Sequence, residues 1–294
     1  FNAGEIYQHS YILVFVSMFV DNLDSASKAN RSLICVGLDP IMSLIPSGDV
    51  FQFNKCIIDA TKDHVCAYKP NLAFYEALGD SGLEALKNTI EYIREFASGV
   101  LIIGDAKRGD IEHSNVAYAR AMFVRWGFDA VTVNAYAGME SVRPFSDYED
   151  RGVIVLCRTS NPGSDVFQEL NVQHDEISMP LYEFVARQAV QWNTNGNLAL
   201  VVGANYHHQL ANVRAICGDM PILIPGIGSQ GGDLRGAVRS GINENGRRII
   251  INSSRSILYA SQGSDFAYKA EETAKGLKDS INLILQEQGL GWDK

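Results

Sequence analysis

The feature of this sequence that most restricts its fold is a regular alternation of short apolar runs with longer segments of helical periodicity. The apolar runs have the length and composition of buried strands. There are eight of them, at 32–38, 65–69, 100–105, 130–134, 152–157, 198–203, 222–225 and 248–252. Amphipathic segments that repeat apolar residues at the spacing of one helix face lie between them, for example at 50–63, 82–96, 111–126, 181–192 and 267–286.

Strands that alternate with helices are expected to be parallel and joined by right-handed crossovers. Eight such units in about 260 residues match the size and strand count of a (β/α)8 barrel. The alternative is an open, doubly wound sheet, which usually has fewer strands before a domain break. No linker rich in Pro, Gly or Ser and no run of charges marks such a break in this chain. The sequence therefore predicts an α/β protein with a single (β/α)8 TIM-barrel domain.

The first part of the chain is predicted to be an N-terminal extension, residues 1–16, of unknown role. Its apolar run 11–20 has the length of the hydrophobic part of a signal peptide, but no Lys or Arg precedes it. The run is also too short to span a bilayer. We expect the barrel domain to occupy 17–294 and to begin with a helix near Ser17 that buries Phe19, Leu23 and Ala26.

Charge and cysteine content narrow the possible partners. With 34 Asp and Glu against 25 Lys and Arg, the formal net charge is -9, so neither nucleic acid nor a membrane surface is an expected partner. The 5 cysteines form no C-x-x-C pair, which suits a reducing compartment, and we expect a cytoplasmic protein. His207 and His208 are adjacent rather than four residues apart, so no metal site is expected.

Polar residues at the carboxyl ends of barrel strands are the first candidates for chemistry. The densest cluster is the run D-A-K-R-G-D-I at 105–111. Side chains two apart on a strand point the same way, so Asp105 and Lys107 face one side, whereas Asp110 lies past the strand end and points elsewhere. Lys69 ends the neighbouring strand. Such alternating charges keep one another ionised and place a proton donor, although a structural ion pair capping the barrel is the alternative.

A glycine-rich run follows the seventh predicted strand, P-G-I-G-S-Q-G-G-D at 225–233, and contains G-x-G-x-x-G. A dinucleotide-binding fold would need further βαβ units, yet one strand and a terminal helix remain. We expect instead a monophosphate site built from backbone N–H groups and Arg255, unless the glycines serve only tight turns.

A third polar run, R-T-S-N-P-G-S at 158–164, precedes a long irregular stretch that is predicted to reach about Met179. Long loops inside compact domains are usually lids or binding loops, so Ser160 is a candidate for contact with a ligand. The same residues are also good turn formers, and both interpretations can hold together.

Seven short motifs appear in a fixed order along the chain. They are Gly37-Leu38-Asp39-Pro40, Lys69-Pro70, D-A-K-R-G-D-I at 105–111, V-T-V-N-A-Y at 131–136, T-S-N-P-G-S at 159–164, P-G-I-G-S-Q-G-G at 225–232 and Ser253-Ser254-Arg255. In this order they resemble the orotidine 5'-phosphate decarboxylase family, more its longer branch than the compact archaeal one. The resemblance extends from about Ser17 to Ile284. It implies a cofactor-free carboxy-lyase that converts orotidine 5'-monophosphate to UMP and carbon dioxide, the last step of de novo UMP synthesis.

The resemblance also implies a homodimer with active sites at the subunit interface, and a role for each matching residue. The catalytic residues would be Lys69, Asp105, Lys107 and, contributed to the partner's site, Asp110. Lys107 would protonate carbon 6 as carbon dioxide leaves, and Asp105 would lie beside the departing carboxylate, destabilising the ground state or positioning Lys107. The substrate-binding residues would be Asp39, Ile111, Ser114, Ser160, Gln230, Gly231, Ser254 and Arg255.

Within that set, the resemblance places Asp39 and Lys69 on the ribose and Ser160 on the pyrimidine. It places Gln230 on the base and phosphate, and Arg255 on the phosphate. Ile111 and Ser114 would join Asp110 across the subunit interface. The chain departs from the family pattern at 112–114, where Glu-His-Ser replaces small residues and a Thr, although Ser114 keeps a hydroxyl.

Two other functions fit parts of the sequence. A metal-dependent sugar-phosphate decarboxylase or aldolase of the same superfamily also carries D-x-K-x-x-D, but it resembles a site with an acidic residue at the end of the second strand, where this chain has Lys69. A non-catalytic nucleotide-phosphate-binding protein is expected to have lost one of the four charges, and all four are present. The predicted enzyme therefore uses no metal and no cofactor.

Overall fold

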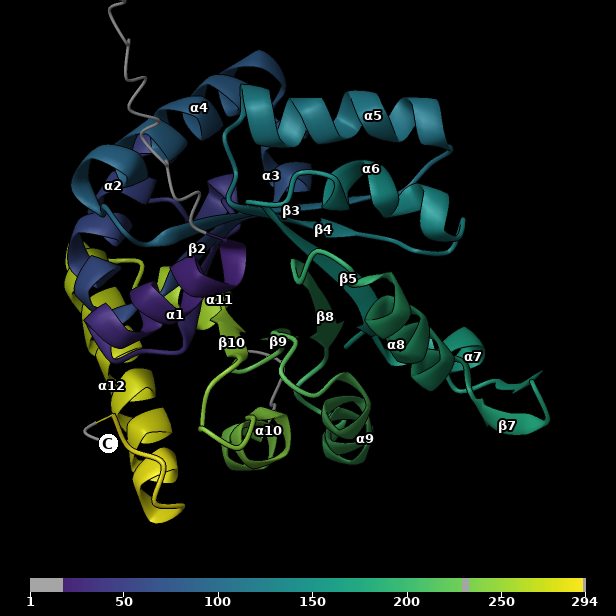
Figure 1. Cartoon of the computed structure of the whole chain (residues 1–294). Coiled ribbons are helices and arrows are strands. Elements are labelled where there is room, and N and C mark those ends of the chain that lie inside the picture. The colour runs from purple at the N-terminus through teal and green to yellow at the C-terminus, as the bar shows by residue number, and fades with distance from the viewer. Residues whose placement is uncertain (1–17, 229–232, 293–294) are drawn as a thin grey trace, which may run out of the picture.

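Eight parallel strands close into a barrel in the structure, a computed structural model that describes residues 18–228 and 233–292 (Figure 1). They are β1 (Ile34–Leu38), β2 (Ala67–Pro70), β3 (Leu101–Arg108), β4 (Ala130–Val133), β5 (Gly152–Arg158), β8 (Leu198–Val202), β9 (Ile222–Pro225) and β10 (Ile249–Ser253). The order around the barrel is β1-β10-β9-β8-β5-β4-β3-β2. Because β10 pairs with β1, the sheet has no edge, which confirms the predicted (β/α)8 barrel and excludes the open sheet.

Helices surround the barrel and close one of its ends. They are α1 (Phe19–Asn30), α2 (Val50–Thr61), α3 (Leu72–Glu76), α4 (Gly79–Phe96), α5 (Glu112–Arg120), α6 (Arg143–Ser146), α7 (Asp165–Gln168), α8 (Leu181–Trp192), α9 (His207–Cys217), α10 (Leu234–Gly241), α11 (Arg255–Leu258) and α12 (Phe266–Glu287). The last helix, α12, packs against α2, so the two ends of the ring of helices meet (Figure 1).

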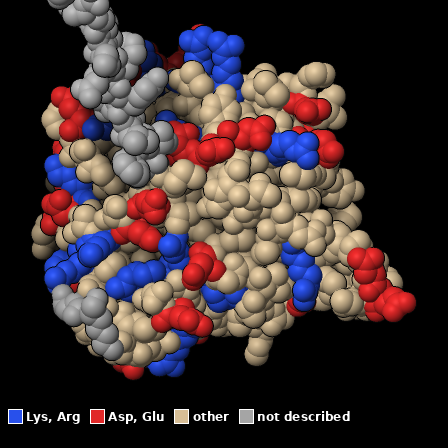
Figure 2. Space-filling model, viewed as in Figure 1, with Lys and Arg blue, Asp and Glu red and all other residues tan. Residues whose placement is uncertain are grey.

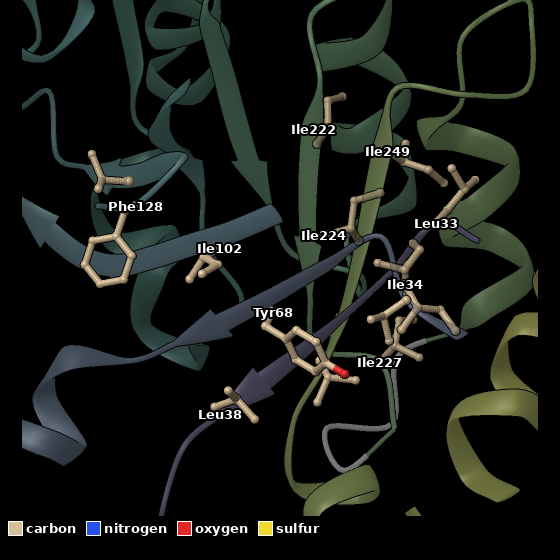
Figure 3. Close-up of a cluster of buried hydrophobic side chains, with 14 of the residues drawn as sticks. Leu33, Ile34, Leu38, Tyr68, Ile102, Phe128, Ile222, Ile224, Ile227 and Ile249 are labelled. Carbon is tan, nitrogen blue, oxygen red and sulfur yellow. The ribbon is translucent and has the colours of Figure 1, made fainter. Parts of the chain in front are cut away.

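The core has two layers because successive side chains of a strand point to opposite faces. One layer lies between the strands and the helices, and Figure 3 shows part of it, including Ile34, Tyr68 and Ile224. The other fills the barrel with small side chains such as Cys35 and Ala67 together with larger ones such as Ile103 and Leu223. Barrel interiors of eight strands hold only side chains, so this layer makes a solid floor beneath the mouth.

The first helix closes the amino end of the barrel. Phe19, Leu23 and Ala26 are buried in the inner layer, as predicted, although the helix begins at Phe19 and Ser17 lies outside the described residues. A Cβ at Gly152, the first residue of β5, would lie 2.7 Å from the Phe19 ring, so glycine is needed there. With α1 at this end, the carboxyl ends of the strands form the open mouth. The predicted extension, residues 1–16, lies outside the described residues.

The stretch after β5 differs from the prediction of an irregular loop. It contains α7 and an antiparallel hairpin, β6 (Asn171–His174) and β7 (Ile177–Pro180), which projects from the barrel (Figure 1). The hairpin turns at Asp175 and Glu176, whose φ angles of 45° and 65° are those of a tight two-residue turn. The prediction was wrong because this pair lacks the Asn-Gly signature that usually marks such a turn.

The surface carries charges of both signs. Figure 2 shows Lys and Arg interspersed with Asp and Glu on the face it presents. Of the helices in the described ranges, none is long and apolar enough to cross a membrane. Each of the five cysteines is free.

Candidate functional site

A carboxylate held between two ammonium groups lies in the mouth of the barrel. Asp105 on β3 accepts from Lys69 Nζ on β2 at 2.7 Å through Oδ2, and from Lys107 Nζ at 2.5 Å through Oδ1. Lys69 is 4% exposed and Asp105 is 8% exposed, whereas about half of the Lys107 side chain reaches solvent. The structure thus brings together three of the predicted catalytic residues, and Lys107 is the most exposed of them.

The electrostatics of this cluster keep its buried members charged. Burial by itself would raise the pKa of Asp105, but the charges of Lys69 and Lys107 outweigh it and hold that pKa well below the ordinary value. Burial would likewise lower the pKa of Lys69, but the carboxylates of Asp105 and Asp39 reverse the effect and raise it. Asp105 is therefore a fixed negative charge and Lys69 a fixed positive charge at neutral pH.

The backbone of Lys107 has an uncommon conformation that aims its side chain. Its φ of 46° lies in the left-handed region, which side chains other than glycine seldom adopt. The register between β3 and β4 also shifts between Gly104 and Arg108. Such strain persists only where the surroundings hold it, and it is often found at functional sites.

Two residues that support the site were missed by the sequence analysis. Thr132 on β4 donates to Asp105 Oδ1 at 2.9 Å and accepts from the backbone N–H of Lys107 at 2.9 Å. The hydroxyl of Tyr259 accepts from Ile41 N at 2.6 Å and donates to Asp39 O at 3.0 Å. The polar Thr132 inside an otherwise apolar strand was a signal that could have been used, but nothing in the sequence pairs Tyr259 with Asp39.

A cavity of about 160 Å³ adjoins the charged cluster. It is lined by Asp39, Lys69, Asp105, Pro225, Gly226, Ile227, Asn252, Ser254 and Arg255. Oδ1 of Asp39 and Oδ1 of Asn252 are buried there, and no protein group in the described ranges donates a hydrogen bond to either. Buried acceptors of this kind are usually paired. The cavity therefore suits a small ligand that brings hydroxyl donors.

The loops after β9 and β10 form one wall of this cavity. Gly226 and Gly228, directly after β9, have φ angles of 105° and 92°. These positive angles are strained for other residues, so both positions favour glycine. Ser254 lies at the N-cap of the short helix α11, and Arg255 is its first residue and is exposed at the cavity. A Cβ at Gly37 would collide with the Ser254 side chain, which explains the glycine after Val36. The predicted ligands Gln230 and Gly231 lie outside the described residues.

The predicted interface residues are not among those that line this cavity. Asp110, in the link between β3 and α5, is exposed, and its Oδ1 accepts from the N–H of Ile111 at 2.7 Å. Ile111 is 69% exposed. Ser114 is partly buried on the first turn of α5. None of these three lines the cavity beside Asp105.

The loop after β5 carries Ser160 and is tied down by Arg158. The guanidinium of Arg158 is buried, donates to Glu169 Oε1 at 2.9 Å, and stacks 3.7 Å from the ring of Tyr206. Ser160 packs on Gly203, where a Cβ would lie 2.9 Å from the Ser160 Cα. Arg158 therefore has an internal structural role, and Ser160 remains at the mouth, partly exposed.

A larger cavity, about 750 Å³, lies outside the charged cluster. Mostly apolar side chains from α8, α7 and the loop after β4 line it, including Tyr136, Phe167, Tyr182, Phe184 and Trp192. It holds no carboxylate or ammonium group, so the smaller cavity is the better candidate for chemistry. In the part of the chain that the structure describes, no cluster of three or more His, Cys, Asp or Glu could hold a metal ion.

Comparison with known proteins agrees with this geometry. A family model described as the orotidine 5'-phosphate decarboxylase / HUMPS family matches residues 32–270. The chain is 48% identical over 265 residues to an orotidine 5'-phosphate decarboxylase of Dehalococcoides mccartyi, covering 90% of this chain and 97% of the relative. It is 47% identical over 275 residues to that of a Janthinobacterium species, covering 91% and 99%.

Solved structures show the same likeness. The OMP decarboxylase of Leishmania donovani superposes with a TM-score of 0.79 at 38% identity, covering 91% of this chain and 98% of that one. The UMP synthase of the same organism superposes with a TM-score of 0.81 at 39% identity, and this chain spans 56% of its length.

Proposed function

The chain belongs to the orotidine 5'-phosphate decarboxylase / HUMPS family, and from this membership we propose how its residues carry out the reaction. It is a carboxy-lyase that converts orotidine 5'-monophosphate to UMP and carbon dioxide in UMP synthesis. We propose that Lys69, Asp105 and Lys107 act in one site, with Asp110 supplied by a second copy. The observation that carries the proposal is the Asp105 carboxylate held between two ammonium groups at the barrel mouth.

The identity of Lys69 also separates this chain from the alternatives. A buried ammonium 2.7 Å from Asp105 occupies the place where a metal-dependent relative would need an acidic ligand. A protein that only binds nucleotides has no need to keep a buried, charged cluster, because burying charges costs free energy. Lys69 and Asp105 therefore favour decarboxylation without a metal or cofactor.

In the proposed mechanism Lys107 is the proton donor. The bond between carbon 6 and the carboxylate breaks, its electron pair stays on carbon 6, and a proton moves from Lys107 Nζ to that carbon. The ammonium of Lys107 stabilises the developing negative charge before the transfer, in a site already arranged for it. Asp105 holds Lys107 in place and lies beside the departing carboxylate. Lys107 regains a proton from water after product leaves.

The adjoining cavity would hold the ribose phosphate. The Oδ1 atoms of Asp39 and Asn252, which accept no hydrogen bond from the described residues, are acceptors suited to ribose hydroxyls. Arg255 would clamp the phosphate, together with Ser254, Gln230 and Gly231. Part of the binding energy from these groups can stabilise loops that close over the reacting carbon. Their loss should therefore lower kcat as well as raise KM. Ser160 would contact the pyrimidine.

We further propose that two copies associate through the face that carries Asp110. The support is four exposed apolar side chains on and next to α5, namely Ile111, Val116, Tyr118 and Val124. Exposed apolar patches of this kind mark interaction surfaces. Ile111 and Ser114 would then meet the partner's substrate along with Asp110. Analytical ultracentrifugation should give the mass of a dimer, and Val116→Glu should shift it toward a monomer.

The working compartment and the domain limits are also proposals. The five free cysteines suit a reducing compartment, and we propose that the enzyme works in the cytoplasm. We propose that residues 17–294 form the catalytic domain and that 1–16 are an extension to it.

The test of the proposed mechanism is a decarboxylation assay with chelator present. The wild-type protein should consume orotidine 5'-monophosphate, followed by pyrimidine absorbance, and Lys107→Ala should lose at least a thousandfold in kcat. Lys275→Ala is the matched control, because it removes a surface lysine paired at 2.7 Å with Asp279. Wild-type rates in the Lys107→Ala variant would refute the proton-donor role, and loss of wild-type activity in chelator would favour the metal-dependent alternative.

A further inference from the structure

A buried amide holds the backbone of the segment that carries Asp110. Asn115, near the start of α5, is 0% exposed. Its Oδ1 accepts from the N–H of Asp110 at 3.0 Å, and its Nδ2 donates to the carbonyl of Asp110 at 2.5 Å. Nδ2 also donates to the carbonyl of Glu140, at 3.1 Å. One side chain thus binds both polar groups of the Asp110 peptide backbone and ties them to the loop after β4.

This arrangement is unusual for an asparagine inside a helix. Asn has a poor helix propensity because its amide competes for backbone groups, and burying an amide costs free energy unless its hydrogen bonds are made. Here the donor and acceptor of Asn115 are both used, and both bind the backbone of Asp110, two residues before the first residue of α5. At this position Asn therefore costs helix stability relative to Ala, and its hydrogen bonds to Asp110 offset that cost.

The Asp110 side chain, by contrast, is held only locally among the described residues. Its carboxylate accepts from the N–H of the next residue, Ile111, and is otherwise directed to solvent. The neighbouring Gly109 packs so closely on the carbonyl of Asn134 that a Cβ would collide with it. The position of the Asp110 carboxylate is therefore set by its backbone, and the backbone is set by Asn115 on one side and by Asn134 on the other.

We propose that Asn115 is a positioning residue that fixes Asp110 so that its carboxylate enters the partner subunit's active site at one position. The inference rests on the proposed role of Asp110 in the second copy. An exposed carboxylate on a short link can take many positions, and a loss of about 1 Å in placement can cost about a hundredfold in rate. Asn115 touches no reacting atom; it acts through Asp110.

The proposal predicts a non-additive pair of substitutions. Asn115→Ala should lower kcat/KM at least tenfold, toward the value of Asp110→Ala. In the Asp110→Ala background, Asn115→Ala should change kcat/KM by less than threefold, because the group that it positions is already gone. Hydrogen exchange at 109–111 should become faster in Asn115→Ala, since the N–H of Asp110 loses its acceptor. Asn115→Ser serves in the same cycle if the alanine variant does not fold.

Asn197 offers a matched control at the amino end of the barrel. It is 1% exposed and its Nδ2 donates to the carbonyls of Ser146, Tyr148 and Arg151 at 3.0, 3.1 and 3.0 Å. Asn197→Ala should lower the melting temperature about as much as Asn115→Ala does, yet leave kcat/KM per folded molecule unchanged. This comparison separates a loss of positioning from a general loss of stability.

Each other outcome overturns the inference. If Asn115→Ala lowers kcat/KM by the same factor in both backgrounds, or leaves it unchanged while exchange at 109–111 accelerates, Asn115 does not position Asp110. If Asp110→Ala is as active as the wild type, Asp110 has no role to support and the inference falls with it. A wild-type protein that does not consume orotidine 5'-monophosphate would instead refute the proposed function. Hydrogen exchange at 109–111 does not report on that reaction, so the wild-type assay distinguishes the two failures.

Discussion

Thr132→Val replaces the hydroxyl that connects β4 to the charged cluster with a methyl group of nearly the same size. The hydroxyl donates to Asp105 Oδ1 and accepts from the N–H of Lys107, each at 2.9 Å. Thr132 is 1% exposed, so water cannot easily take its place. The substitution therefore leaves one oxygen of Asp105 with a single donor and leaves the N–H of Lys107 without an acceptor, while the packing of the strand is nearly unchanged.

The expected magnitude follows from those two bonds. A hydrogen bond to a charged group contributes about 1.5–3 kcal/mol, and a buried N–H left unpaired costs about 1–3 kcal/mol. Lys107 also has a left-handed φ of 46°, and the bond to Thr132 helps to hold it there. If the first contribution is lost from the transition state, kcat falls by roughly 10- to 100-fold, because each 1.36 kcal/mol is tenfold in rate. KM should change much less, since Thr132 does not line the substrate cavity.

The assay is steady-state decarboxylation followed by absorbance, with unfolding in urea measured on the same preparations. Thr89→Val is the control: Thr89 is buried in α4, donates to Ala85 O at 2.7 Å and accepts from Asn54 at 3.0 Å. It should lose stability and keep its kcat. A kcat within twofold of wild type for Thr132→Val, in folded protein, would refute the claim that Thr132 holds Asp105 and Lys107 in their reactive arrangement.

Three further predictions concern Asp105, Tyr259 and Arg158. Because the pKa of Asp105 is held below its ordinary value, this carboxylate stabilises the fold above about pH 4 and its contribution is lost as the pH falls. The difference in unfolding free energy between wild type and Asp105→Asn should therefore shrink between about pH 5 and about pH 3, and a constant difference would contradict the assignment. Tyr259→Phe removes the hydroxyl that binds the N–H of Ile41 and the carbonyl of Asp39, so KM should rise several-fold while kcat changes little. An unchanged KM would argue that Asp39 does not bind the substrate. Arg158→Met breaks the ion pair between the buried Arg158 and the partly exposed Glu169 and removes a stacked contact, so urea unfolding should show a loss of about 1.5–3 kcal/mol, whereas a loss below about 1 kcal/mol would argue against an internal role.

The parts of the fold that the sequence predicted well are those set by local patterns. Strand and helix periodicity is a property of consecutive residues, so the strands and the burial of Phe19 and Leu23 could be predicted without knowledge of the barrel. The hairpin β6–β7 could not, because its turn at Asp175 and Glu176 lacks the usual residues. Its pairing depends on strand contacts rather than on a local signal.

The same distinction holds for the candidate site. Asp105 and Lys107 are two residues apart on one strand, and Lys69 ends a neighbouring strand, so their meeting follows from a barrel of parallel strands. The family resemblance predicted a role for each of these residues, but it did not predict which atoms are in contact. The Oδ1 atoms of Asp39 and Asn252, without a hydrogen-bond donor among the described residues, could not be predicted, because the cavity they line forms only when β1 and β10 are adjacent.

By itself the sequence determined an eight-stranded barrel with a charged rim, because strand periodicity and the direction of side chains two apart are local properties of the chain. Only the tertiary structure decided which groups support that rim. Thr132 lies 27 residues from Asp105, and Tyr259 lies 220 residues from Asp39, in the hydrogen bonds that they make. Contacts at such separations depend on the register of the strands and on closure of the barrel, and no pattern of neighbouring residues encodes them.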